Sequence, residues 1–237
     1  MITQFLRGEE ARDLKITLDF WEKEGHAKGA FFKTQIVGPV TLALHTKSGE
    51  EKNVLARAKR QVDEIRKRGW NPILFFDEPS LSIINPLILE KEKKRLQEMF
   101  HEYAAELDAV TGIHCCGRTN WDFLFGTGVD IISFDAAKDA DHFFKNASGI
   151  RKHFENGRSI AWGLVPSTSV GYELDCKAVA ETLIERIKKI AFPPLSLRHI
   201  LLHSLVSTSC GTMGLSLEEN RKAHEWVRTI SSILSQQ

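Results

Sequence analysis

Short apolar runs alternate with longer amphipathic stretches along this chain of 237 residues, and this alternation restricts its fold more than any other feature. Most of the apolar runs are rich in Ile, Leu, Val or Phe, and they predict buried strands at Ala30–Val37, Pro72–Phe76, Val110–His114, Val129–Phe134, Ser159–Leu164 and His199–Val206. Runs that are apolar on both faces favour a parallel sheet covered by helices. The stretches between them are charged and have helical periodicity, which predicts helices at Glu50–Arg68, Leu87–Ala105, Asp139–Asn156, Lys177–Ala191 and Ser216–Leu234.

A succession of strand–helix units is typical of a TIM barrel or a doubly wound sheet, both of the α/β class. Polar residues follow many of the predicted strands, as they do in a barrel whose site is built from several strand ends, whereas a doubly wound sheet concentrates its site at one switch point. We therefore predict a (β/α) barrel that forms a single domain over residues 1–237. The predicted strands are fewer than the eight of a complete barrel. Met1–Leu6 could add one, or the barrel is incomplete at its N-terminus and closed by another chain.

Three residues of the kinds that bind metal ions lie at two predicted strand ends. His114 and Cys116 are two positions apart, so both side chains point to the same side of an extended chain while Cys115 points away. Cys210 follows the last predicted strand. One imidazole and two thiolates are a frequent ligand set for zinc, and three dispersed ligands are typical of a site that keeps one position open.

The composition excludes several other classes of protein. The net charge is +1, with 32 basic and 31 acidic residues, so nothing in it favours binding to nucleic acid or to a membrane surface. The first residues are charged and do not form a signal peptide, and no apolar stretch reaches the roughly 18 residues of a membrane span. Four cysteines are too few for a disulfide scaffold, which predicts a reducing, cytoplasmic location.

Four motifs, taken in order, resemble the catalytic barrel of cobalamin-independent methionine synthase, whose superfamily includes uroporphyrinogen decarboxylase and the zinc methyltransferases that act on corrinoid proteins. The motifs are Gly38-Pro39-Val40-Thr41, Asp77-Glu78-Pro79-Ser80-Leu81, His114-Cys115-Cys116-Gly117 and Ser209-Cys210-Gly211. The resemblance covers about Phe31 to the C-terminus and implies that the first units of the family's barrel are absent. It also implies a zinc-dependent methyltransferase.

The resemblance places the zinc ion on His114, Cys116 and Cys210, with a thiol substrate completing the coordination. Methionine synthases add a glutamate at the end of the following strand, and Asp135 holds that position here. We therefore include Asp135 among the metal ligands, and the alternative is a helix N-cap.

The resemblance also assigns Asp77 to the amino group of an amino-acid thiol such as homocysteine. We count Asp77 and Glu78 as catalytic and substrate-binding residues. The alternatives are a helix cap or a salt bridge for Asp77, and structural hydrogen bonding for Glu78.

Two departures from the family pattern concern the methyl donor. The tryptophan that stacks on folate in the family is replaced by His45, and the family's catalytic histidine is missing from the segment Gly163–Thr168. Both favour a methylated corrinoid, carried on a partner protein, over methyltetrahydrofolate. The alternatives are a decarboxylase-like enzyme and a non-catalytic barrel that binds a corrinoid protein. An incomplete barrel would also favour self-association or a complementing subunit.

Overall fold

The computed structural model describes residues 9–46, 53–168 and 173–237, so the strand considered for Met1–Leu6 lies outside the described residues. The strands are β1 Phe31–Val37, β2 Asn71–Asp77, β3 Val110–Cys115, β4 Ile131–Phe134, β5 Ser159–Val165 and β6 Ser204–Thr208. The α-helices are α2 Glu9–Lys23, α3 Pro39–His45, α4 Val54–Lys67, α5 Pro86–Glu106, α6 Trp121–Phe125, α7 Ala136–Phe143, α8 Ala147–Glu155, α9 Cys176–Lys188, α10 Leu197–Leu202 and α11 Leu217–Leu234, with 3-10 turns η2 Pro79–Ser82 and η3 Phe144–Asn146. None of the described helices is long and apolar enough to cross a membrane.

The chain divides into two compact units. The first comprises Met1–His114 and Thr127–Val129, and the second comprises Cys115–Gly126 and Asp130–Gln237. The boundary falls inside β3, between His114 and Cys115, so the strand itself runs from one unit into the other. The single-domain organisation over residues 1–237 stays a prediction.

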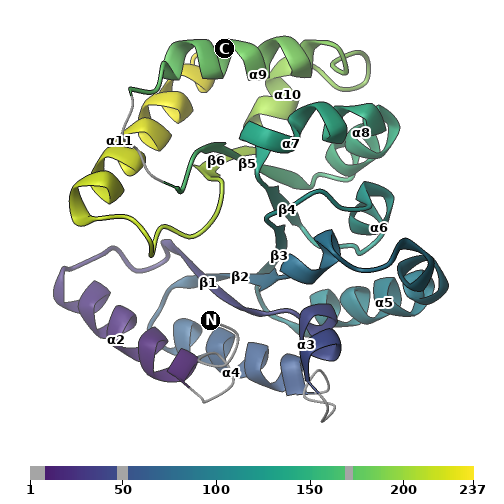
Figure 1. The fold of residues 1–237 in the computed structure, drawn as a ribbon. Helices are drawn as coiled ribbons and strands as arrows, with labels where there is room; N and C mark the ends of the chain where they lie inside the picture. Colours follow the sequence, from purple (N-terminus) through teal and green to yellow (C-terminus); the bar gives the residue numbers. More distant parts are fainter. Residues whose placement is uncertain (1–8, 47–52, 169–172) are drawn as a thin grey trace. The chain divides into compact units, whose positions relative to one another are not determined.

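The first unit is built on the parallel strands β1, β2 and β3, which lie in chain order (Figure 1). One face of β1 and β2 is buried under helices, because alternate residues of a strand point to opposite faces. A cluster around Phe32 and Trp70 forms the core between this face and the helices α2 and α4, and it contains Leu14, Leu18 and Ile65 as well. The opposite face of the same strands carries Lys33, Gln35 and Asp77.

The second unit is built on β4, β5 and β6, again parallel and in chain order. Helix α7 packs against β5, and α11 packs against β6 and α9. Aromatic rings fill the core, and the Phe134 ring stacks on that of Phe143 with 4.4 Å between their centroids while Trp162 meets both rings edge-on. Large aromatic side chains bury much apolar surface each, so this cluster fixes β4 and β5 against α7.

The fold is therefore α/β, with parallel strands that follow the chain order within each unit and helices between them. A doubly wound sheet reverses its strand order at a switch point, and the described strands of each unit show no reversal. This succession is the repeating unit of a TIM barrel, which was the predicted architecture.

The prediction for His199–Val206 was wrong in its first half. Residues Leu197–Leu202 form helix α10, and the strand begins only at Ser204. The Ser196 hydroxyl accepts a hydrogen bond from the His199 amide and caps the start of this helix, a signal that the apolar composition of the run concealed. The predicted helix Asp139–Asn156 is likewise divided, because Asn146 caps the start of α8.

Candidate metal and substrate site

Three predicted ligands come together at the ends of β3 and β6. The ligand atoms of His114, Cys116 and Cys210 all lie within 4.8 Å of one another. Cys116 and Cys210 belong to the second unit. His114 lies near the end of β3, two residues before Cys116 in the chain. Among the described residues, this is the group of three or more His, Cys, Asp or Glu side chains that could hold one metal ion. Cys115 is buried, and its Sγ donates to the Gly117 carbonyl oxygen over 3.4 Å.

The thiols of Cys116 and Cys210 interact with each other. The hydrogen bond between Cys116 and Cys210 is the largest effect that raises the pKa of Cys116, followed by burial and by the negative charge of a Cys210 thiolate. Two adjacent thiolates repel each other, which favours the protonated form of Cys116. A cation placed between the sulfur atoms would remove this repulsion, and a metal ion deprotonates the thiols that bind it.

The loop that carries Cys210 is held by close backbone packing. The Ser209 amide donates to the Val165 carbonyl oxygen over 2.7 Å, and the Ser209 hydroxyl accepts from the Ser167 amide over 3.1 Å. A Cβ added at Gly163 would lie 2.5 Å from the Phe134 carbonyl oxygen and 2.8 Å from the Ser209 Cα atom, so this position requires glycine. The ends of β5 and β6 therefore fix Cys210 through its neighbour Ser209.

The donor set fits zinc. Two ligands at about 2.0–2.3 Å from one tetrahedral zinc ion lie about 3.4–3.8 Å apart, which small side-chain rotations would reach from the observed spacing. Cys116 is exposed, so a fourth ligand could enter from solvent.

Asp135 is placed as a helix cap. It is 4% exposed, its Oδ1 accepts from the Lys138 amide over 3.1 Å, and its Oδ2 pairs with the Lys138 ammonium at 3.0 Å. The hydrogen bond and charge of Asp135 raise the pKa of Lys138. Asp135 is outside the three-residue group, and its assignment as a metal ligand stays a prediction.

Asp77 lies beside His114. The two residues are register partners at the ends of β2 and β3, so their side chains share one face of the sheet. The Gly38 amide donates to the Asp77 carbonyl oxygen, and the Glu78 amide donates to the His114 carbonyl oxygen, each over 2.8 Å. These hydrogen bonds extend the backbone pairing of β1 with β2 and of β2 with β3 as far as Asp77 and His114. The roles of Asp77 and Glu78 in substrate binding and catalysis stay predictions.

Glu78 points into the protein and caps helix α3. Its carboxylate is 0% exposed and accepts from the Val40 amide at 2.9 Å, the Thr41 amide at 2.7 Å and the Thr41 hydroxyl at 2.7 Å. Burial raises the pKa of Glu78 from 4.5 to about 7, although these hydrogen bonds oppose the shift. Gly38 is required beside it, because an added Cβ would lie 2.2 Å from a Glu78 carboxylate oxygen.

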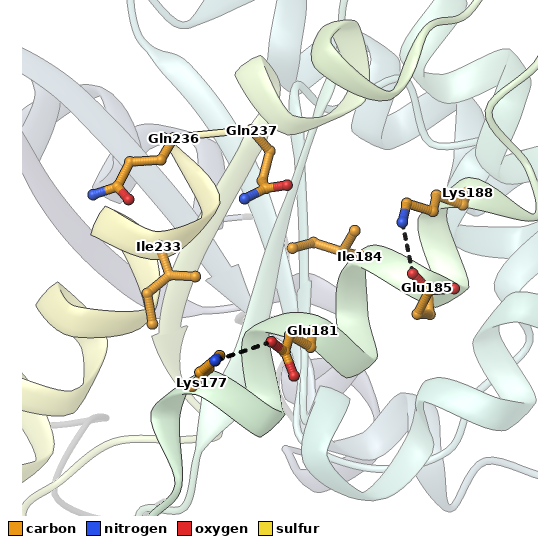
Figure 2. Close-up of a pocket in the computed structure, with 8 residues that line it drawn as sticks. All are labelled: Lys177, Glu181, Ile184, Glu185, Lys188, Ile233, Gln236 and Gln237. Carbon is orange, nitrogen blue, oxygen red and sulfur yellow. Dashed lines mark hydrogen bonds and ion pairs between the residues drawn. The ribbon is translucent and has the colours of Figure 1, made fainter.

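A separate surface hollow lies between α9 and the end of α11 (Figure 2). Its lining residues are Lys177, Glu181, Ile184, Glu185, Lys188, Ile233, Gln236 and Gln237. Lys177 pairs with Glu181 at 3.8 Å and Lys188 with Glu185 at 2.7 Å, so these charges already have partners. None of the predicted site residues lines this hollow, and it carries no functional assignment.

Lys33 and Gln35 are two further polar residues on the face that carries Asp77 and His114, and the sequence analysis did not single them out. They lie on β1. Their signal was present in the sequence, because two polar residues at positions i and i+2 of an apolar run indicate one polar face of a strand.

A chain with this α/β fold and a His/Cys/Cys group is similar in fold to an enzyme of known structure. A methyltransferase from Methanosarcina mazei superimposes with a TM-score of 0.58 at 16% sequence identity, over 93% of this chain. This chain spans 63% of the length of that methyltransferase. At this identity the similarity shows the fold. No protein-family model and no curated protein matched the sequence.

Proposed function

We propose that this protein is a zinc-dependent methyltransferase that moves a methyl group from a methylated corrinoid to a thiol such as homocysteine. The observation that carries the proposal is the His114, Cys116 and Cys210 group, with its ligand atoms within 4.8 Å of one another. The similarity in fold to a methyltransferase supports the proposed reaction class.

The chemistry requires a nucleophilic sulfur at neutral pH. A free thiol has a pKa of about 8.5 and is mostly protonated there. Zinc, when bound, lowers the pKa of a thiol that joins it and so supplies a thiolate. In the transfer, the carbon–cobalt bond of the methyl donor breaks with its electron pair left on cobalt, a carbon–sulfur bond forms, and the thiol proton leaves to solvent.

The residues of this chain would hold and orient the reactants. His114, Cys116 and Cys210 would bind the metal ion, and the exposed side of Cys116 would admit the thiol. The Asp77 carboxylate, next to His114 in register, would bind an ammonium group on the substrate. Glu78 would hold the start of α3, and with it the Gly38–Thr41 turn, in place. The corrinoid would be presented by a partner protein.

The metal content of the purified chain tests this proposal. We expect about one zinc ion per chain by elemental analysis, and loss of most of it in Cys116→Ser and Cys210→Ser. Matched controls are Cys115→Ser, adjacent in sequence but buried, and Cys176→Ser at the start of α9. Both should keep the zinc. Zinc that persists in the two ligand variants would overturn the ligand assignment.

Methyl transfer is measured next, with methylcobalamin as donor and a panel of thiols as acceptors. Activity should appear in the zinc-loaded protein and vanish in Cys210→Ser. A protein that binds no zinc after reconstitution under reducing conditions would refute the methyltransferase and leave the decarboxylase-like or non-catalytic alternatives.

The substitution Asp135→Ala distinguishes a role of Asp135 as the cap of helix α7 from a role as a metal ligand. Because both carboxylate oxygens contact Lys138, we expect a loss of about 1 kcal/mol in the free energy of unfolding and no change in zinc affinity. A loss of zinc affinity of tenfold or more would instead make Asp135 a ligand, as the resemblance implies.

A further inference from the structure

Helix α10 brings two histidines of the second unit together. His199 lies in the helix and His203 is its C-cap, so the two residues are four positions apart, about one helical turn. Their rings stack with 4.5 Å between the centroids and 25° between the ring planes. His203 directly precedes β6 and Cys210 follows it, so the length of that strand separates the histidine pair from Cys210. The pair is therefore distinct from the metal-type group that contains Cys210.

The hydrogen bonds of the two rings fix which nitrogen of each ring carries a proton. His199 Nε2 lies 3.3 Å from the Phe154 carbonyl oxygen, and His203 Nδ1 lies 2.9 Å from the His199 carbonyl oxygen. A carbonyl oxygen only accepts, so each of these two nitrogens donates an N–H. In a neutral imidazole the other nitrogen then carries a lone pair. The free lone pairs are therefore on His199 Nδ1 and His203 Nε2.

Both lone-pair nitrogens are open to a ligand. Within residues 9–46, 53–168 and 173–237, no hydrogen bond reaches either atom, and both side chains are half-buried with these atoms accessible to water. A metal-binding histidine usually donates its other N–H to a backbone carbonyl or a carboxylate, which fixes the orientation of the ring. Each ring of this pair has such a carbonyl partner, so both are already oriented as metal ligands are.

We propose that His199 and His203 bind one divalent transition-metal ion at the end of α10, through His199 Nδ1 and His203 Nε2. Imidazole nitrogen suits Zn²⁺, Ni²⁺ and Cu²⁺. Two nitrogens at about 2.0–2.1 Å from one ion lie about 3 Å apart, and the stacked rings reach this spacing by small side-chain rotations toward each other. Water would fill the remaining positions, because no third His, Cys, Asp or Glu joins the pair in the part of the chain that the structure describes.

The bound ion would stabilise one corner of the second unit. His199 contacts the end of α8 through the Phe154 carbonyl oxygen, and His203 leads directly into β6. An ion held by both rings would therefore fasten α10 between α8 and β6. The helical turn keeps the two rings together only in the folded chain, so the ion binds the folded state more tightly and raises its stability. This role does not depend on the proposed methyl transfer.

Nickel binding to the full-length protein tests the site. The background protein carries Cys116→Ser and Cys210→Ser, which remove the thiols of the other metal-type group, so its result is independent of the proposed function. Isothermal titration calorimetry should show about one Ni²⁺ bound per chain. Saturating Ni²⁺ should also raise the urea midpoint of unfolding of this protein.

Two substitutions remove the ligand nitrogens and keep the hydrogen bonds. The amide nitrogen of His199→Gln takes the place of Nε2 and can still donate to the Phe154 carbonyl oxygen. The amide nitrogen of His203→Asn takes the place of Nδ1 and can still donate to the His199 carbonyl oxygen. Loss of an outer partner of a metal ligand costs about 10- to 100-fold in affinity, so loss of the ligand itself should cost at least about tenfold in each variant. His224→Gln, which removes an exposed histidine of α11, is the matched control and should bind Ni²⁺ as the background protein does.

The outcomes are decisive in either direction. Weaker binding in both His199→Gln and His203→Asn, with metal-free urea midpoints equal to that of the background protein, supports the site. Equal Ni²⁺ affinity in these variants and the background protein overturns it, and the pair then serves only to hold the end of α10 through its hydrogen bonds. If either variant does not fold, the background protein alone decides, because a urea midpoint that Ni²⁺ leaves unchanged also overturns the site.

Discussion

Replacing Glu78 with alanine should destabilise the protein by an amount that depends on pH. The substitution removes the acceptor for the Val40 and Thr41 amides, and both of these residues are buried, with exposed fractions of 3% and 1%. A buried amide without an acceptor costs about 1–3 kcal/mol. For the two amides together we expect a loss of about 2–6 kcal/mol in the free energy of unfolding at pH 5.

The pH dependence follows from the raised pKa of Glu78. Because this pKa is about 7 in the folded protein and 4.5 ordinarily, the stability that Glu78 contributes is fully present below pH 4.5 and is lost as the pH rises through about 7. The difference of about 2.5 units corresponds to about 3 kcal/mol. Because part of this contribution is already lost at pH 5, the cost of Glu78→Ala should fall by about 2.5 kcal/mol between pH 5 and pH 8.

Urea unfolding of wild type and variant in parallel at pH 5, 6, 7 and 8 measures this difference, in which the titration of all other groups cancels. Glu98→Ala on α5, whose side chain is 66% exposed, is the matched control and should change stability by less than about 0.5 kcal/mol throughout. A cost of Glu78→Ala that is the same at pH 5 and pH 8 would refute the raised pKa. A variant as stable as the wild type at pH 5 would refute the capping role.

Two further predictions concern stability. Burial lowers the pKa of His153 from 6.5 to about 4, and its Nε2 donates to the Ser159 carbonyl oxygen. The free energy of unfolding of the wild type should therefore fall by about 3 kcal/mol relative to that of His153→Gln as the pH falls from 6.5 to 4. Parallel urea unfolding curves of the two proteins that do not diverge over this range would contradict the prediction. Gly163→Ala brings a Cβ within 2.5 Å of the Phe134 carbonyl oxygen and should lower the free energy of unfolding by about 1–3 kcal/mol and weaken zinc binding. Gly214→Ala, which meets no atom within 4 Å, should leave both unchanged, and equal effects of the two substitutions would argue against the steric explanation.

Much of the fold could be predicted because the signals are local. The run Pro72–Phe76 became β2, Asn71–Asp77, with one residue added at each end. Ser216 and Glu219, a Ser and a Glu three positions apart, form a capping box at the start of α11, as this pattern predicts. Gly69 has φ of 82°, in the left-handed region that a glycine after a helix readily adopts. Each of these features depends on a few neighbouring residues, so a sequence window is enough to detect it.

The errors arose where a distant or unrecognised contact decides the outcome. The apolar run from His199 could form a helix or a strand, and the cap at Ser196 decided for the helix. The three hydrogen bonds of the Glu78 carboxylate to α3 were likewise outside the reach of sequence patterns, because they depend on Val40 and Thr41, which lie far from Glu78 in sequence. Periodicity contains no information on such pairs.

The sequence by itself determined the types of ligand and their spacing along the chain. His114 and Cys116 lie two apart at a strand end, so their convergence follows from the geometry of one extended segment. The arrival of Cys210 beside them was decided by the tertiary structure, because it depends on the parallel pairing of β5 with β6 and on the close approach of Ser209 to Gly163. The position of Lys33 on the face of Asp77 and His114 was likewise set by strand register, which is a property of the assembled sheet and not of any one strand.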